Sequence, residues 1–162
     1  EARASMARYA TYAGETAVWA AESAKTPMVP IMRGLELGSS LTWTDSKITR
    51  NEKFPASVGK WQPRIPEWRA TAVATYRPDD KWSYTLGARY SGKQYSTLDN
   101  SDPNGFAYQG ASRYFTTDVR VRYQITKAVS AAVGIDNLNN YQYWNFHPYP
   151  QRSYTLELKV DL

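Results

Sequence analysis

The chain has 162 residues, no cysteine and a formal net charge of +5, and it reads as a single domain. Without cysteine it has neither a disulfide framework nor a thiolate metal site. The modest positive charge suits an anionic ligand or lipopolysaccharide and does not by itself indicate nucleic acid, so no nucleic-acid partner is expected.

The first part of the chain has the weakest pattern. Residues 5–12 and 15–22 could form two strands, although the Ala-rich stretch 16–24 fits a short helix equally well. Two prolines in residues 25–32 predict a connection there.

From residue 33 onward, apolar and polar residues alternate in six stretches, which predict strands at 33–45, 67–77, 82–92, 113–124, 128–137 and 152–162. A strand directs successive side chains to opposite faces, so each of these strands has an apolar face and a polar face. The connections between the six strands are alternately long and short. In an antiparallel meander, all the long connections then lie at one end of the sheet.

These strands are of the length that crosses a bilayer when tilted, and most carry aromatic residues near their ends. Tyr and Trp are enriched at membrane–water interfaces, and long external loops with short periplasmic turns are typical of outer-membrane barrels. The pattern therefore favours an all-β antiparallel meander in a transmembrane β-barrel over a soluble sandwich. No apolar run is long enough for a membrane helix.

The two faces receive different predictions. The apolar face is expected to contact lipid through Leu35, Leu37, Trp68, Tyr76, Trp82, Tyr84, Leu86, Val119, Val121, Val133, Ile135, Tyr154, Leu156, Leu158 and Val160. The opposite face is expected to line the lumen with Glu36, Arg69, Arg89, Asp118, Arg120, Arg122, Glu157 and Lys159. Ion pairs that satisfy lumen charges and bind a plug are the expected role of this second set.

Four motifs carry a family resemblance. They are Arg33-Gly34-Leu35-Glu36-Leu37, Pro63-Arg64-Ile65-Pro66, Gly87-Ala88-Arg89-Tyr90-Ser91-Gly92, and Asp136-Asn137-Leu138-Asn139-Asn140 followed by Tyr143. In this order and spacing, residues 33–162 resemble the closing third of a TonB-dependent outer-membrane receptor. The stretch 146–152 is similar to the siderophore and metal-chelate branch. The family usually ends on an aromatic residue, often Phe, where this sequence has Leu162.

The resemblance implies that residues 1–162 are the C-terminal segment of a barrel of about 22 strands, with the plug domain and TonB box outside this sequence. It implies a receptor in the Gram-negative outer membrane that imports a ferric siderophore or similar metal chelate. The energy would come from TonB, which the receptor would contact through its plug. The segment would supply barrel wall and external loops, surrounded by lipid and lipopolysaccharide. No cofactor is expected apart from the transported chelate.

Two rival interpretations remain at this point. The first is a self-standing eight-stranded outer-membrane barrel with a structural or adhesive role, and the second is a soluble all-β binding module. An enzyme is not expected, because no constellation of acid, base and nucleophile can be assembled from these residues. No resident metal site is expected either.

Two loop clusters are candidate ligand sites. The first is aromatic: Tyr141, Tyr143, Trp144, Phe146, His147 and Tyr149 could grip a chelate by stacking, or could form an interfacial girdle. The second is basic: Lys53, Lys60 and Arg64 could steer an anionic chelate, contact lipopolysaccharide phosphates, or belong to an ordinary solvated loop.

Overall fold

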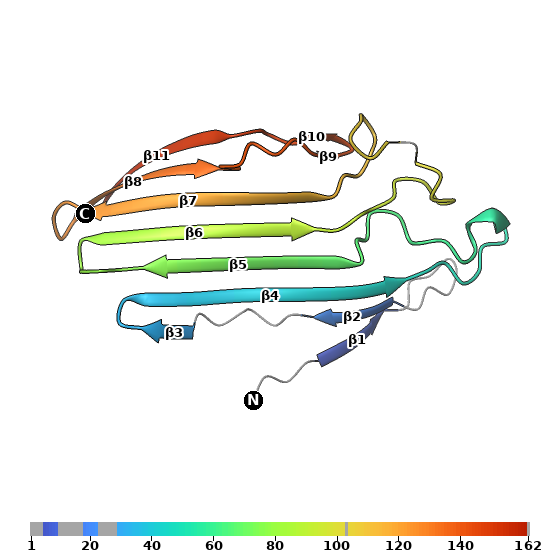
Figure 1. Cartoon of the computed structure of the whole chain (residues 1–162), viewed down its shortest axis with the longest axis horizontal. Coiled ribbons are helices and arrows are strands. Elements are labelled where there is room, and N and C mark those ends of the chain that lie inside the picture. Colours follow the sequence, from blue (N-terminus) through green and yellow to red (C-terminus); the bar gives the residue numbers. More distant parts are fainter. Residues whose placement is uncertain (1–4, 10–17, 23–28, 103, 162) are drawn as a thin grey trace.

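The computed structural model describes residues 5–9, 18–22, 29–102 and 104–161, and in this part of the chain one antiparallel sheet dominates (Figure 1). Its strands follow the order β1-β2-β4-β5-β6-β7-β8-β11, and β3 pairs with β4 beside this path. The strands are β1 (Ser5–Tyr9), β2 (Val18–Glu22), β3 (Val29–Met32), β4 (Leu35–Ser46), β5 (Trp68–Tyr76), β6 (Trp82–Ser91), β7 (Tyr114–Gln124), β8 (Val129–Asp136) and β11 (Ser153–Val160). A separate two-stranded sheet joins β9 (Trp144–Asn145) to β10 (His147–Pro148), and one short 3₁₀ helix, η1, covers Pro55–Ser57.

The six predicted strands are confirmed as β4, β5, β6, β7, β8 and β11, each within or close to its expected range. The predicted meander is confirmed as well, because each of these strands pairs antiparallel with the next. Over the described residues, no helix is long and apolar enough to span a membrane.

The beginning of the chain contains two short strands and not the alternative short helix. Strands β1 and β2 fall within residues 5–12 and 15–22, and they pair antiparallel; the remainder of those ranges lies outside the described residues. The short helix is wrong for Val18–Glu22, which is extended and pairs with β4.

The connection expected at 25–32 is also wrong in part, because Val29–Met32 forms strand β3. This strand pairs with β4, and in the described part of the chain it has no partner on its other side. An edge strand tolerates proline because the missing N–H is not needed for a second ladder. The register also shifts after Pro30, which marks an irregularity there.

All three long connections lie at one end of the sheet, as expected (Figure 1). We call them the first loop (residues 47–67), the second loop (92–113) and the third loop (137–152), and we call this end the loop end. The opposite, turn end holds the tight connections 33–34, 77–81 and 125–128. In one of these turns, Asp79 accepts hydrogen bonds from the backbone N–H groups of Lys81 and Trp82, at 2.8 and 2.9 Å.

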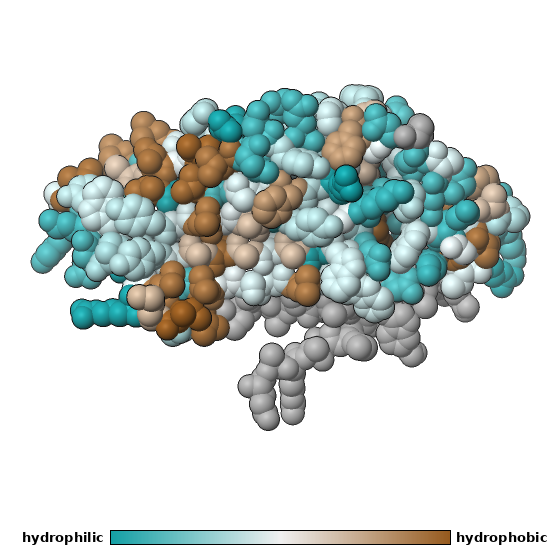
Figure 2. Space-filling view, in the orientation of Figure 1, coloured by the Kyte–Doolittle hydropathy of each residue, from teal (hydrophilic) through white to brown (hydrophobic). Residues whose placement is uncertain are grey.

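The strand register places all the predicted lipid-facing residues on one face of the sheet, the apolar face. Direct cross-strand partners form a continuous row on this face: Leu37, Ala74, Leu86, Val119, Ile135 and Tyr154. In Figure 2, hydrophobic side chains form a band that crosses the strands, with more polar residues towards both ends. The side chains of this face are open, and Leu156 is 83% exposed.

Aromatic residues border the apolar face at both ends. At the turn end, the ring of Trp82 lies 5.8 Å from that of Tyr84 and 4.5 Å from that of Tyr123. At the loop end, Trp43 and Trp68 are 6.5 Å apart between ring centroids. The same two rows include Trp82 and Tyr90 on β6 and Tyr123 and Phe115 on β7, and on each strand eight residues separate them, which is about 26 Å of strand. If the strands are tilted by some 40°, this length spans about 20 Å along the bilayer normal. Outer-membrane barrels have an outward apolar band of about 25 Å, which is similar in height.

The register gathers the predicted lumen-facing residues on the opposite, charged face. Three cross-strand ion pairs lie there: Arg77 with Glu36 at 2.7 Å, Arg89 with Asp118 at 3.0 Å, and Arg120 with Glu157. Exposed pairs of this kind stabilise a fold only weakly, by about 0–1 kcal/mol. Their effect is rather to neutralise charge within one wall.

The sheet is a single layer, and no second layer covers either of its faces in the described part of the chain (Figure 1). The buried apolar side chains among these residues are Ile48, Ala111, Ala132 and Tyr143, and only Ala132 belongs to a strand. A soluble module would pack its apolar face against another layer. The structure therefore argues against the soluble rival.

Candidate functional site

The second loop is bound to the first loop by a reciprocal contact of Asn100. Its amide oxygen accepts the backbone N–H of Trp61 at 2.7 Å, and its Nδ2 donates to the carbonyl of the same residue at 2.9 Å. The backbone N–H of Arg64 also donates to the carbonyl of Tyr95 at 2.8 Å. Arg64 and Asn100 both adopt left-handed backbone conformations, with φ of 63° and 58°.

The second loop is bound to the third loop by backbone hydrogen bonds. Phe146 donates to the carbonyl of Gly110 and accepts from the N–H of Gln109, both at 2.8 Å. Ser112 donates its N–H to the carbonyl of Trp144 at 2.9 Å, and its hydroxyl accepts the N–H of Trp144 at the same distance. The three loops therefore form one connected surface at the loop end of the wall.

The base of the third loop is built by the asparagines of the motif at 136–140. Asn137 is buried and left-handed, with a φ of 52°, a conformation that Asn tolerates better than most residues. Its side chain donates to the carbonyl of Tyr141 and accepts the N–H of Tyr141, each at 2.9 Å. Asn139 fastens the same segment to β7, because it donates to the carbonyl of Phe115 at 2.8 Å.

Three tyrosines stack where the third loop meets the start of β7. The ring of Tyr143 lies 4.5 Å from that of Tyr114 at the start of β7, and 4.7 Å from that of Tyr149. Tyr143 is 8% exposed. Burial raises the pKa of the Tyr143 hydroxyl, and the positive charge of Arg89 partly opposes this rise. Arg89 of the charged face is therefore close enough to act on the buried part of the third loop.

A second aromatic group is exposed and contains residues from all three loops. Tyr108 of the second loop is 62% exposed, and its ring lies 5.1 Å from that of His147 and 5.9 Å from that of Phe146. The guanidinium of Arg64 from the first loop lies 5.5 Å from the centre of the Phe146 ring, within cation–π range. We call Arg64, Tyr108, Phe146 and His147 the outer aromatic cluster.

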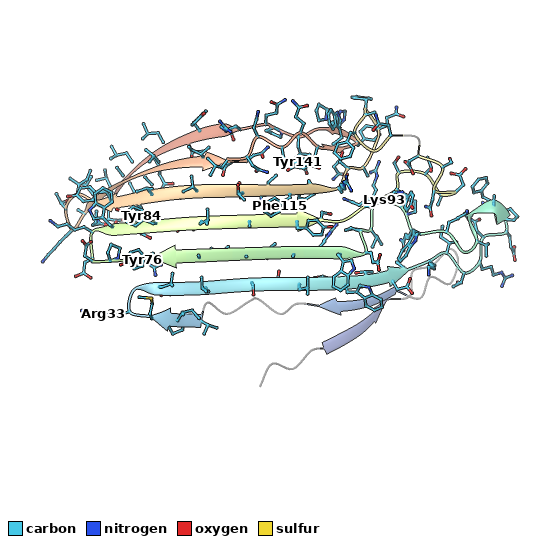
Figure 3. The ribbon with its side chains drawn as sticks, in the orientation of Figure 1. Arg33, Tyr76, Tyr84, Lys93, Phe115 and Tyr141 are labelled. Atoms are coloured by element: carbon cyan, nitrogen blue, oxygen red, sulfur yellow. The ribbon has the colours of Figure 1, made fainter. Side chains whose placement is uncertain are left out.

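Phe106 adds further aromatic contacts between the second and third loops. Its ring centroid lies 6.4 Å from that of Tyr141 and 6.3 Å from that of Trp144. In Figure 3, Tyr141 and Lys93 lie at the loop end, whereas Tyr76, Tyr84 and Arg33 lie at the turn end. The aromatic residues of the second and third loops thus lie together at one end of the wall.

The structure brings together most, but not all, of the predicted site residues. Arg64 joins Phe146 and His147 of the third loop, whereas Tyr143 and Tyr149 belong to the tyrosine stack, in which only Tyr143 is buried. The side chains of Lys53 and Lys60 make no ion pair or cation–π contact with any described residue, and neither joins the cluster. Sequence reasoning missed Phe106 and Tyr108; the available signal was a pair of aromatic residues two positions apart in a mostly polar loop.

The second loop also carries two hydrogen-bonded carboxylates. Burial acts to raise the pKa of Asp102, but hydrogen bonds from Ser96 and Thr97 outweigh this effect and lower it below its ordinary value. Hydrogen bonds from Ser101 lower the pKa of Asp99. Both carboxylates therefore stay ionised at neutral pH and order the loop from within.

Comparison with known proteins agrees with this architecture. Residues 10–138 match the family model described as "TonB dependent receptor-like, beta-barrel". The probable TonB-dependent siderophore receptor PiuA of Acinetobacter baumannii is 26% identical over 117 residues, which are 67% of this chain and 15% of that receptor. The ferripyoverdine receptor of Pseudomonas aeruginosa is 28% identical over 109 residues, which are 67% of this chain and 13% of that receptor.

The fold is shared with a solved receptor as well. The crystal structure of BauA, the ferric preacinetobactin receptor from Acinetobacter baumannii, superposes with a TM-score of 0.72 at 20% identity, over 92% of this chain and 22% of that one. The matched stretch of the chain spans about a seventh of each of the two curated relatives. A match over most of its length shows that the chain belongs to the TonB-dependent receptor family of the Gram-negative outer membrane and forms part of its β-barrel.

Proposed function

We propose that the complete receptor binds a ferric siderophore or a similar metal chelate at the cell surface and imports it with energy passed from TonB. Two kinds of support combine here. Both curated relatives carry siderophore names, "Probable TonB-dependent siderophore receptor PiuA" and "Ferripyoverdine receptor". The outer aromatic cluster gathers π faces and a guanidinium from three loops at one end of the wall.

The outer aromatic cluster is the observation that carries the proposal. Exposed aromatic rings can stack on the flat organic part of a chelate, and a guanidinium attracts its negative charge. Arg64 and Tyr108 therefore contact the ligand directly, and Phe146 and His147 support them. The stack of Tyr114, Tyr143 and Tyr149, in which the central Tyr143 is buried, ties the third loop to β7 and so supports the loop that carries Phe146 and His147.

The two edges of the sheet indicate how this segment continues into a larger barrel. Strands β1 and β11 have one described neighbour each, so we infer that both edges pair with further strands of a larger barrel. We further propose, as the family resemblance implies, that residues 1–162 are the C-terminal barrel segment, with the plug and its TonB contact elsewhere in the protein. The apolar face contacts lipid, and the basic residues of the loops attract lipopolysaccharide phosphates. Iron enters as part of the cargo, and no resident cofactor is required.

The proposal is tested by uptake of ⁵⁵Fe complexes of catecholate, hydroxamate and citrate chelators into cells that express the full-length receptor. Arg64→Ala is expected to raise the half-saturating concentration of the transported complex by about 2- to 30-fold, because the variant loses the charge that attracts the chelate and the cation–π contact with Phe146. Tyr108→Ala is expected to have an effect of similar size.

Arg50→Ala is the matched control, because Arg50 is an exposed arginine of the same loop that pairs with Glu52. It is expected to leave uptake unchanged. Uptake that persists without TonB would contradict the proposed transport, and equal effects of Arg50→Ala and Arg64→Ala would contradict the proposed site.

A further inference from the structure

One carboxylate on the charged face is bound both by the wall and by the third loop. The Nη2 of Arg89 lies 3.0 Å from Oδ2 and 3.1 Å from Oδ1 of Asp118. The backbone N–H of Asn137 donates to the same Oδ1 at 2.9 Å. Asp118 therefore joins β6, β7 and the first residue of the third loop at a single point.

The contact continues from Asn137 into the loop. Asn137 is 4% exposed, and its side chain binds both the N–H and the carbonyl of Tyr141. Its left-handed backbone is less favourable than the right-handed one for an L-residue, so neighbouring contacts are needed to hold it. An unbroken series of hydrogen bonds thus runs from Arg89 through Asp118 and Asn137 to Tyr141.

The Arg77–Glu36 and Arg120–Glu157 ion pairs of the charged face lack this extension. Among the described residues, Glu36 accepts only from Arg77, and Glu157 accepts only from Arg120. Neither pair reaches one of the three long loops, because Arg77 and Glu36 lie at the turn end and Arg120 and Glu157 lie within β7 and β11. Asp118 is also less exposed than either of them, with 25% of its side chain accessible against 40% for Glu36 and 51% for Glu157.

We propose that Asp118 is a positioning residue, which holds the third loop in its ligand-binding arrangement, and that Arg89 fixes the orientation of its carboxylate. This inference rests on the proposed function, because the third loop that Asp118 holds carries Phe146 and His147 of the outer aromatic cluster. The ionised carboxylate makes a stronger acceptor for the Asn137 N–H than a neutral group would. Loss of Asp118 frees that N–H and releases the turn at Asn137.

Hydrogen–deuterium exchange of the full-length receptor tests the inference without any ligand. Asp118→Ala is expected to speed exchange of the amides of Asn137 and Tyr141 by about 10- to 100-fold, because hydrogen bonds to charged groups are among the strong ones. Asp118→Asn keeps an acceptor oxygen, so it is expected to restore most of the protection. Arg89→Gln is expected to give an intermediate increase.

Glu36→Ala is the matched control, since it breaks an ion pair of the same wall at the turn end. It is expected to leave exchange in the third loop unchanged. Exchange in Asp118→Ala no faster than in Glu36→Ala would overturn the inference. So would an Asp118→Asn variant that exchanges as fast as Asp118→Ala.

A second measurement separates positioning from a general loss of stability. In the ⁵⁵Fe assay, Asp118→Ala is expected to raise the half-saturating concentration by about 10-fold or more, with the maximal rate per assembled receptor kept. A fall in maximal rate alone would overturn the positioning role. If exchange responds as expected but no iron complex is taken up by the wild type, the proposed function fails and the structural link at Asp118 stands.

Discussion

Leu86→Arg is the most direct test of the face that we assign to lipid. Leu86 lies on the apolar face of β6, and its side chain is 52% exposed. Trp82 and Tyr90, from the two aromatic rows, lie four residues away in either direction, which is about 13 Å along the strand. With a tilt of some 40°, Leu86 is about 10 Å from each interface, close to the middle of the bilayer.

The expected cost follows from this depth. An arginine on the lipid face near the midplane destabilises an outer-membrane barrel by about 2–4 kcal/mol, and the cost falls to about 0–1 kcal/mol near the interface. The direct neighbours of Leu86 across the sheet are Ala74 and Val119, which offer no partner for a positive charge. We therefore expect the upper part of the midplane range.

The matched control is Val73→Arg. Val73 is also an apolar residue of the central strands, and it pairs with Gly87, the residue after Leu86, on the opposite face. If the charged face lines the lumen, an arginine there is expected to cost about 1 kcal/mol or less, because charge in a wet lumen needs little desolvation.

The measurement is the free energy of unfolding of the full-length receptor refolded into lipid vesicles, obtained from denaturant titrations followed by tryptophan fluorescence. Equal costs for Leu86→Arg and Val73→Arg would refute the assignment of the faces. A larger cost for Val73→Arg would reverse it.

Two further predictions concern a turn and a loop. Gly34 and Gly59 are both left-handed, with φ of 79° and 80°, but a Cβ on Gly34 would collide with the carbonyl of Arg77, whereas one on Gly59 meets nothing within 4 Å. Gly59→Ala should therefore cost about 1–2 kcal/mol and Gly34→Ala clearly more, in the same denaturant titrations. Asp102 has a lowered pKa in the folded state, so its contribution to stability is present above its ordinary value of 3.8 and is lost as the pH falls through the lower folded value. Asp102→Asn should therefore destabilise the receptor at pH 7, with a difference from wild type that shrinks as the pH falls below 3.8.

The strands were predictable because their signal is local. The period-2 alternation of a strand such as Ser153–Val160 sets which side chains share a face, and the register then extends that face across the sheet. The positions of the long loops followed from the same pattern, since a meander of antiparallel strands leaves no other arrangement. Family resemblance added what alternation cannot provide, namely the larger barrel.

The candidate site was less predictable because its contacts are not local. Nothing in the sequence near Asp118 indicates that its carboxylate accepts the N–H of Asn137, 19 residues later. The same holds for Arg64 and Phe146, which meet only after two loops have folded against the second loop. Proline misled the prediction at 25–32, since its effect depends on whether the strand lies at an edge, and sequence alone does not show this.

The final prediction concerns the two edges of the sheet. Strand β11 pairs with β8 and strand β1 with β2, and in the described part of the chain neither pairs with a further strand. Lipid cannot satisfy the unpaired N–H and C=O groups of such an edge, and in water the exposed Leu156 and Leu158 add an apolar surface beside it. Purified residues 1–162 are therefore expected to aggregate, or to lack heat-modifiable migration on a gel, while the full-length receptor shows this migration. A closed, monomeric barrel of residues 1–162 in detergent, with β1 bonded to β11, would contradict the reasoning and restore the self-standing eight-stranded alternative.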